Sequence, residues 1–378
     1  MDLTLTEEQR LLAESVARFF AKEYSFEKRR KIAASEDGFS RDIWAQFAEL
    51  GWLGIGTSES VGGLGGGDVE ISILMEGIGR HIVVEPFFPT VVLGAGLLRR
   101  GGAKMAGHLP ALVEGKLQLA LAHSEPKARF ELAHVETRAA RDGGIFALSG
   151  RKAVALNAQH ADYIVVSART GGAITDENGI TIFLVPKDAR GMGLMPYRTV
   201  DGLQAAEVTL DKVPVEAGGI LGELDGGLAL LAHARDEALV GLSAEAVGAM
   251  EALVDVTRDY LKTRKQFGVP IGSFQVLQHR LVDMYMAQEL ARSTVAVAAR
   301  ALADHDRHYR AQAAAAAKVQ AGRGGRLVGQ EAVQLHGGMG MTDELAVGHY
   351  FKRLAAIDVQ FGNADHHERR FAELSATV

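Results

Sequence analysis

The sequence predicts an α+β protein with an N-terminal helical domain, a central β domain and a C-terminal helical bundle. Three observations support this fold class: helical spacing of apolar residues in the first third, short apolar runs between breakers in the middle, and helical spacing again after that. The 378 residues are enough for several packed layers. We place the domains at residues 1–116, 117–226 and 227–378, and expect the two helical parts to form one bundle that the β domain interrupts.

The N-terminal domain carries signals for helix starts and stops. Thr6 and Gln9 have the spacing of a capping box, and apolar residues then recur at helical period. A second amphipathic stretch around Ile43 stops at Gly51, a residue type that often follows a helix C-terminus. The glycine-rich stretch 62–67 predicts a loop between helices, because it lacks the preceding strand and the Lys-Ser/Thr ending of a phosphate-binding loop.

Short apolar runs predict the strands of the central domain. Strands are expected at residues 117–122, 135–141, 145–149, 163–167, 180–185 and 207–210. The sequence Asp142-Gly143-Gly144 predicts a hairpin turn, and Pro186, Gly191 and Pro214 are expected to separate strands. Helical spacing returns at 250–261 and 277–285, and residues 311–317 are rich in alanine, the strongest helix former.

Composition and charge exclude several classes of protein. The net charge of −6 argues against a nucleic-acid partner, which requires an excess of Lys and Arg. The absence of cysteine excludes disulfides, thiolate nucleophiles and Cys-ligated metals. No apolar run reaches the roughly 18–20 residues of a membrane span, and the start does not resemble a signal peptide. We therefore expect a cytoplasmic protein without a membrane partner.

Three stretches resemble the acyl-CoA dehydrogenase family. The sequence RKQFG at 264–268, followed by Phe274 and Gln275, resembles its RxxFG…FQ signature, and QLHGG at 334–338 matches its loop of that sequence. The opening LTEEQ and the segment ELGWLGIGTSESVGGLGGG resemble its N-terminal helices. The resemblance covers essentially the whole chain. It implies FAD-dependent oxidation of an acyl-CoA thioester to an enoyl-CoA, an electron-transfer flavoprotein or similar acceptor, and a homo- or heterotetramer.

The resemblance also implies a set of cofactor contacts. In the family, the arginine of RxxFG pairs with the FAD pyrophosphate and the QLHGG loop lies along the adenosine half, both reaching the FAD of a neighbouring subunit. By position, the cofactor-binding residues are Arg264, Phe267, Gln275, Gln334, Leu335, His336, Gly337 and Gly338. A guanidinium suits phosphate because it donates two bonds at once. The alternative is that Arg264 is a solvated helix-end cation and that the two glycines only end a helix.

The residues that would bind the chain's own flavin depart from the family pattern. The family reads TEPxAGSD and KxWITN, whereas this chain reads SEPKARFE from Ser124 and KAVALN from Lys152. Ser124 keeps a hydroxyl for the flavin ring, so we include it among the cofactor-binding residues. Arg129 and Phe130 replace small residues, while Val154 and Leu156 replace the tryptophan and the threonine. The chain therefore keeps the contacts it would make to a neighbour's FAD and has altered its own.

The catalytic base is the largest departure. The family's C-terminal IYEGT aligns with residues 359–363 and places Phe361 where the glutamate stands, next to Gly362, a substrate-binding position. Phe361 cannot accept a proton, although its main-chain N–H can still donate to the thioester oxygen. Other members carry the glutamate at the position of Ala238, so Glu237 is a candidate base; a solvated carboxylate beside Arg235 is the alternative.

The histidines after this loop do not predict a metal site. The stretch Asp365-His366-His367-Glu368 has no second ligand cluster at a characteristic spacing, so we expect a polar surface or a contact at the edge of CoA. Three hypotheses remain open: a subunit that acts with a catalytic partner, a homotetramer with a displaced base at Glu237 or Asp365, and a non-catalytic scaffold. The sequence does not reveal the acyl chain.

Overall fold

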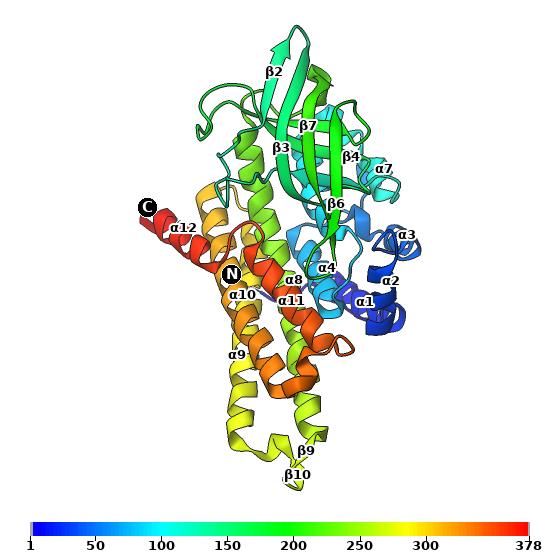
Figure 1. Ribbon diagram of the computed structural model, residues 1–378, viewed down its shortest axis with the longest axis vertical. Helices are drawn as coiled ribbons and strands as arrows, with labels where there is room; N and C mark the ends of the chain where they lie inside the picture. The colour runs from blue at the N-terminus through cyan, green and yellow to red at the C-terminus, as the bar shows by residue number, and fades with distance from the viewer. Residues whose placement is uncertain (1–2, 377–378) are drawn as a thin grey trace. The chain divides into compact units, whose positions relative to one another are not determined.

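The computed structural model describes residues 3–376, and it confirms the α+β fold with helices before and after a β domain (Figure 1). The α-helices are α1 (Glu7–Glu23), α2 (Phe26–Ala34), α3 (Arg41–Glu49), α4 (Asp68–His81), α5 (Gly96–Arg100), α6 (Ala103–Ala106), α7 (Leu109–Val113), α8 (Gly227–Thr263), α9 (Gln275–Ala301), α10 (Arg307–His336), α11 (Ala346–Val359) and α12 (Ala364–Ala376). The strands are β1 (Leu119–Ala122), β2 (Arg138–Asp142), β3 (Ile145–Leu156), β4 (Tyr163–Arg169), β5 (Ile180–Pro186), β6 (Met192–Arg198), β7 (Gln204–Glu216), β8 (Ile220–Leu221), β9 (Lys265–Gln266) and β10 (Val269–Pro270).

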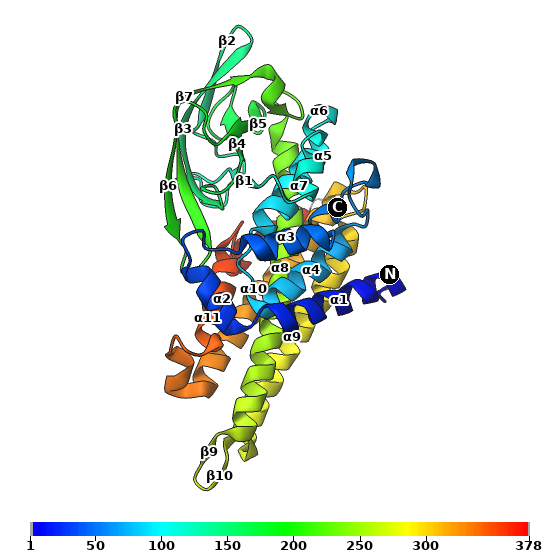
Figure 2. The same ribbon diagram turned by 90° about the vertical axis from the view of Figure 1, so that its right-hand side faces the viewer.

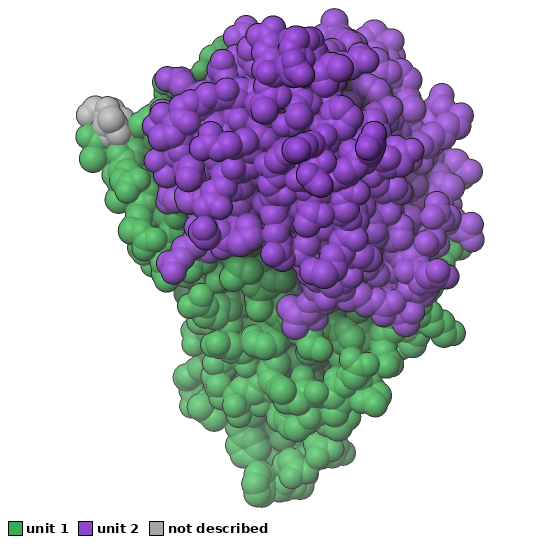
Figure 3. All heavy atoms as spheres, turned by 45° about the horizontal axis from the view of Figure 1, so that its top comes forward, with its two compact units in different colours: residues 1–31, 68–83, 239–378 green, residues 32–67, 84–238 purple. Residues whose placement is uncertain are grey.

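The chain divides into two compact units, which Figure 3 colours separately. Unit 1 comprises Met1–Lys31, Asp68–Val83 and Leu239–Val378, and unit 2 comprises Ile32–Gly67 and Val84–Ala238. Helices α1 and α4 thus share a unit with the C-terminal helices, as an interrupted bundle requires. In unit 1, a Cβ on Gly79 of α4 would lie 1.8 Å from the main-chain oxygen of Glu245 on α8, so glycine permits this close helix crossing.

Unit 2 contains a mixed eight-stranded sheet. Its strands follow the order β6-β7-β3-β2-β4-β5-β8, and β1 pairs in parallel with β4. The predicted hairpin at 142–144 joins the antiparallel strands β2 and β3. Strand β6 was not expected, because Pro196 interrupts its pattern; it lies at the sheet edge, where a missing N–H is tolerated. Pro214 lies inside β7 and does not separate strands as expected.

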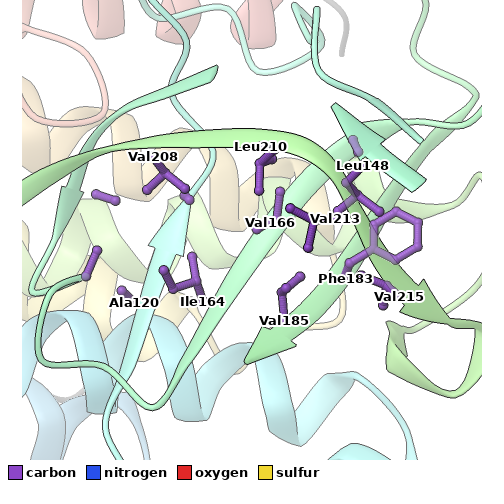
Figure 4. Packing of buried hydrophobic residues seen from close by; sticks show 14 of the residues in the cluster. Ala120, Leu148, Ile164, Val166, Phe183, Val185, Val208, Leu210, Val213 and Val215 are labelled. Atoms are coloured by element: carbon purple, nitrogen blue, oxygen red, sulfur yellow. The ribbon is translucent and has the colours of Figure 1, made fainter. Parts of the chain in front are cut away.

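The core of the sheet follows from alternating β-branched and aromatic side chains. Figure 4 shows these residues gathered from several strands into one apolar layer. The labelled members are Ala120, Leu148, Ile164, Val166, Phe183, Val185, Val208, Leu210, Val213 and Val215. Alternate residues of β4 and β5 belong to two different apolar clusters, so both faces are covered and the expected strands at 163–167 and 180–185 are almost wholly buried.

Long helices dominate unit 1. Helices α9 and α10 have 27 and 30 residues, and the β9–β10 hairpin lies at the tip where the chain passes from α8 to α9 (Figures 1 and 2). The predicted capping box is confirmed, since Thr6 and Gln9 exchange hydrogen bonds between side chain and main chain of 3.2 and 3.0 Å. Within residues 3–376, no helix is both long and apolar enough to cross a membrane.

Candidate functional site

Backbone strain coincides with the stretches that align with the family's flavin-binding, RxxFG and catalytic-base motifs. Among the described residues, eight residues other than glycine have a positive φ. Five of them lie in these stretches, namely Arg129 (49°), Val154 (54°), Asn157 (60°), Phe267 (53°) and Phe361 (57°). Such conformations cost about 1–3 kcal/mol each, less for asparagine, and concentrate at functional sites. The strained main chain therefore agrees with a functional role for these segments.

The hairpin after α8 presents an exposed aromatic ring. Phe267 and Gly268 form its two-residue turn, with φ values of 53° and 81°, a turn that usually takes Asn-Gly. The Phe267 side chain is 90% exposed and touches the Phe274 ring edge-on at a centroid distance of 6.2 Å. A large apolar ring in a strained and exposed position adds little to the core. Its placement suits contact with another molecule.

The end of α8 lies beside the turn that ends α10. The Arg264 N–H donates to the Tyr260 carbonyl at 2.8 Å, and the Tyr260 hydroxyl donates to the His336 carbonyl at 3.4 Å. The rings of Tyr260 and His336 stack with centroids 4.3 Å apart. Arg264 follows Tyr260 by about one helical turn, so it lies on the same face of the chain as the residue that contacts the QLHGG turn.

The residues of this turn divide into an exposed and a buried set. Gln334, Gly337 and Gly338 are exposed, whereas Leu335 and His336 are buried. Burial lowers the pKa of His336, so its ring is neutral and Nδ1–H donates to the Ala332 carbonyl at 2.8 Å. The side chains of Leu335 and His336 therefore support the turn, and only their main chain is left for a ligand.

The exposed set fits the half of FAD that the resemblance assigns to it. Arg264 and Gln275 are also exposed, which adds a guanidinium and a second carboxamide to the donor set. A Cβ on Gly337 or Gly338 would meet no atom within 4 Å, so their main chain is open to a ligand. A guanidinium suits a pyrophosphate, and amides with open main chain suit an adenosine moiety.

In unit 2, the positions expected to bed the chain's own flavin lie on two joined segments. The Ser124 side chain is exposed, and the Ser124 carbonyl accepts the Ala153 N–H at 2.8 Å. Strand β3 has an irregular register between Lys152 and Ala155, and Val154 within it is 49% exposed. A bulge of this kind turns side chains out of the ladder. Ser124 and Val154 are thus presented by neighbouring pieces of main chain.

A buried polar cluster that the sequence did not reveal lies next to these segments. It consists of His123, Glu125, Lys152 and Ser167, which are between 0% and 9% exposed. Lys152 Nζ lies 2.7 Å from Glu125 Oε1. No local sequence pattern predicts it, because its members are distributed over residues 123 to 167. We call these four residues the Lys152 cluster.

The loop that carries Phe361 is held by a hydrogen bond from a buried histidine to the Phe361 carbonyl. Phe361 and Gly362 have φ values of 57° and 109°, and a Cβ on Gly362 would lie 2.7 Å from His367 Nε2. Burial lowers the pKa of His367 to about 3, so the ring is neutral and Nε2–H donates to the Phe361 carbonyl at 2.8 Å. His367 is fully buried, so the expectation of a polar surface at Asp365–Glu368 is wrong at this residue.

A buried lysine fixes the end of α11 just before this loop. Lys318 is fully buried, and its Nζ donates to the carbonyls of Ile357 and Asp358. Burial lowers the pKa of this lysine to about 7. The Asp358 carboxylate accepts the Ala364 N–H at 3.2 Å and pairs with Arg326 at 3.0 Å. The backbone at Phe361 is thus tightly held, although its side chain cannot act as a base.

Glu237 is not the solvated carboxylate that the sequence suggested. It is 5% exposed, and its Oε1 lies 2.7 Å from Arg100 Nη2 and 3.9 Å from Arg99 Nη2. Arg235, the expected neighbour, pairs instead with Asp236 at 3.3 Å. A carboxylate in an ion pair with α5 is engaged in holding helices together. The structure thus gives Glu237 a structural partner and leaves its assignment as a base a proposal.

No group of three or more His, Asp or Glu side chains within residues 3–376 is placed to hold a metal ion.

Comparisons with known proteins agree along the whole chain. Three family models match: acyl-CoA dehydrogenase N-terminal domain at residues 6–116, middle domain at 120–213 and C-terminal domain at 225–374. The probable acyl-CoA dehydrogenase YngJ of Bacillus subtilis is 31% identical over 97% of both chains. Two solved structures match with a TM-score of 0.89. A variant of the Tcur3481-Tcur3483 steroid ACAD is 31% identical and covers 99% of both chains. The ChsE4-ChsE5 complex from Mycobacterium tuberculosis is 27% identical and covers 100% of both.

Proposed function

We propose, since this chain belongs to the acyl-CoA dehydrogenase family, that it is one subunit of a heteromeric enzyme whose partner supplies the catalytic base. The family consists of FAD-dependent oxidoreductases, and FAD is the cofactor of the chain. When bound, FAD accepts a hydride from the β-carbon of an acyl-CoA thioester. The product of the proposed reaction is the trans-enoyl-CoA.

The single observation that carries the proposal is the fixed loop around Phe361. Proton removal next to the thioester carbonyl requires a carboxylate close to the α-carbon. The loop has a strained backbone that Lys318 and His367 support, yet the side chain at the position of the base is a phenyl ring. A main-chain N–H at this position remains suited to the thioester oxygen. The nearest carboxylate in sequence before the loop, that of Asp358, is occupied by Arg326 and the Ala364 N–H.

The exposed residues at the tip of unit 1 support a partner. Arg264, Phe267 and Gln275 are exposed, and Phe267 pays a conformational cost without a gain in core packing. Residues placed in this way suit the FAD of a neighbouring subunit. Two of the structures that the chain resembles are named as pairs of different chains, Tcur3481-Tcur3483 and ChsE4-ChsE5.

The finer identity is part of the same proposal. Within the family, the sequence looks most like the small subunit of pimeloyl-CoA dehydrogenase. Dicarboxylic, aromatic and sterol side-chain acyl groups are the substrates to test, and an electron-transfer flavoprotein or a similar protein is the proposed electron acceptor. A heterotetramer is the proposed assembly.

The test is to purify the chain alone and together with a second chain of the family that bears the glutamate. The measurements are the FAD content per chain and the rate at which an acyl-CoA reduces the flavin. We expect turnover only for the pair. Stoichiometric FAD and full turnover by the chain alone would exclude the partner and favour a homotetramer with a displaced base at Glu237 or Asp365.

A second candidate function is that of a scaffold that only completes the partner's FAD site. The observation that favours it is Val154, which is half-exposed where the family has a tryptophan over the flavin ring. A scaffold requires no acyl-CoA in its own cleft. Equilibrium dialysis with a labelled thioester separates the two candidates, because the scaffold binds none when the partner is absent.

A further inference from the structure

We propose that the Lys152 cluster positions Ser124 and the Val154 bulge as a preformed bed for this chain's own flavin ring. The inference rests on the proposed function, because it concerns the FAD of that reaction. The cluster residues are positioning residues: they act through the main chain of Ser124 and Val154. The loss of the tryptophan then makes the placement of the main chain more important for binding.

The first step is that the lysine ammonium has three acceptors. Lys152 Nζ donates to Glu125 Oε1 at 2.7 Å, to Ser167 Oγ at 3.0 Å and to the His123 carbonyl at 3.3 Å. Lys152 and Ser167 are fully buried. An ammonium has three N–H donors, so each one has an acceptor and the charge is compensated by the carboxylate.

The second step is that the carboxylate ties further main chain to the lysine. Glu125 Oε2 accepts the Glu136 N–H at 2.6 Å, and Oε1 accepts the Thr137 N–H at 3.0 Å. Burial opposes the charge of Glu125, yet Lys152 and the hydrogen bonds from Thr137 hold its pKa below the usual range. The cluster thereby joins the segment after β1, the start of β2, and strands β3 and β4.

The third step is the position of the cluster. Ser124 lies between His123 and Glu125, and Lys152 holds the carbonyl of one and the carboxylate of the other. Lys152 is also the last regularly paired residue before the bulge. The same lysine therefore fixes both segments of the bed, and the 2.8 Å bond between Ala153 N–H and the Ser124 carbonyl joins them directly.

The fourth step is the hydrogen-bonded pair beside the lysine. His123 Nδ1 lies 2.9 Å from Ser167 Oγ, and burial lowers the pKa of His123 to about 3, so the ring is neutral. Apolar side chains fill buried positions at less cost, as in the apolar cluster of this sheet. Polar residues here extend the network from Lys152 and orient its ammonium, which an apolar core does not do.

The test compares two variants of the cluster with a matched control on the same strand. Ser167→Ala removes one acceptor of the ammonium and leaves the ion pair intact, and Ser167→Thr restores the hydroxyl. Lys152→Met removes the centre of the cluster. Arg151→Met is the control, because Arg151 is the exposed neighbour on β3 and pairs with Glu207 at 3.2 Å.

The purified chain, with any partner that co-purifies, is stripped of FAD and titrated with FAD. The readouts are the dissociation constant from quenching of flavin fluorescence, the absorption spectrum of bound flavin, and the thermal unfolding of the FAD-free protein. We expect about tenfold weaker binding and an altered spectrum for Ser167→Ala, a larger loss for Lys152→Met, and values within about twofold of wild type for Ser167→Thr and Arg151→Met.

Wild-type affinity and an unchanged spectrum in a folded Ser167→Ala protein overturn the inference and leave the proposed function standing. Equal weakening by Ser167→Ala and Ser167→Thr also overturns it, because the hydroxyl is then irrelevant. If the wild-type chain with its partner binds no FAD at all, the proposed function and the inference fall together.

Discussion

The Val154 bulge and the Phe267 hairpin share a strained main-chain conformation but differ in the contacts that support it. Both place a non-glycine residue in the left-handed region, with φ values of 54° and 53°. The bulge is backed by the Lys152 cluster, whereas Phe267 is 90% exposed and meets Phe274 through a single edge-on ring contact. The bulge is fixed by its own fold. The hairpin has a similar strain at an almost wholly exposed residue, and we propose that this residue contacts another molecule.

The loop at Phe361 resembles the bulge more than the hairpin. Lys318 holds the carbonyls before it, as Lys152 holds the carbonyl of His123. Both lysines are fully buried, and burial lowers their pKa values to about 7 and about 8. In each unit, a buried lysine side chain thus donates to main-chain carbonyls of a segment that the resemblance assigns a function. This arrangement preserves the main chain whatever side chain it presents.

The largest expected effect follows because the main chain of the Phe361 loop is held by contacts that do not involve the Phe361 side chain. Phe361→Glu places a carboxylate where the family has its base, and Lys318 and His367 hold the loop through main-chain carbonyls. We expect flavin reduction by acyl-CoA to accelerate by about 10²–10⁴-fold, the usual contribution of a positioned base. Stopped-flow absorbance measures it. Phe361→Gln is the matched control, and equal rates for the two variants contradict the prediction.

The next effect compares how much the region of the Val154 bulge and the region of the Phe267 hairpin contribute to the free energy of unfolding. Glu125→Leu leaves the Lys152 ammonium without its carboxylate, which costs about 3–5 kcal/mol of unfolding free energy. Arg264→Met, at an exposed position, changes it by less than about 0.5 kcal/mol. Urea unfolding measures both. The double variant Glu125→Leu/Lys152→Met is the control and recovers most of the loss; comparable costs at Glu125 and Arg264 would remove the contrast.

The pH dependence of the free energy of unfolding tests whether Lys152, unlike the exposed hairpin residues, titrates as a buried group. Burial lowers the pKa of Lys152 to about 8 from 10.5, so between these values the unfolded chain binds more protons than the folded chain. The free energy of unfolding of wild type minus that of Lys152→Met therefore rises by roughly 2–3 kcal/mol from about pH 8 to 10.5. Urea midpoints across this range measure it. A difference that stays flat or falls with pH shows that the pKa of Lys152 is not lowered in the folded protein.

The sequence predicted the features that depend on residues close together in the chain. Helical and strand periods, the capping box at Thr6 and the hairpin at 142–144 follow from neighbouring residues. Strand β6 was missed because Pro196 is a breaker everywhere except at an edge. The roles of Lys152 and Lys318 have no local signal, since lysine is normally exposed and their partners lie 15 to 40 residues away. Glu237 was misjudged for the same reason, because its partner Arg100 lies on another helix.

The smallest expected effect tests why the hairpin keeps a phenylalanine. Phe267→Asn produces the Asn-Gly pair that this two-residue turn prefers, and it relieves a strained conformation. Because the ring is almost wholly exposed, little core packing is lost, so we expect the unfolding free energy to rise by about 0.5–1 kcal/mol. Thermal and urea unfolding of the chain alone measure this gain.

The same substitution removes the ring that we assign to a neighbour's FAD. The assembled enzyme should then hold FAD several-fold less tightly, while the isolated chain is more stable, and Phe267→Ala separates the loss of the ring from the relief of strain. If Phe267→Asn leaves FAD affinity in the assembly unchanged, the exposed ring has no cofactor role. If it destabilises the isolated chain, the ring contact with Phe274 contributes more than its edge-on geometry indicates, and the hairpin is held by its own fold as the bulge is.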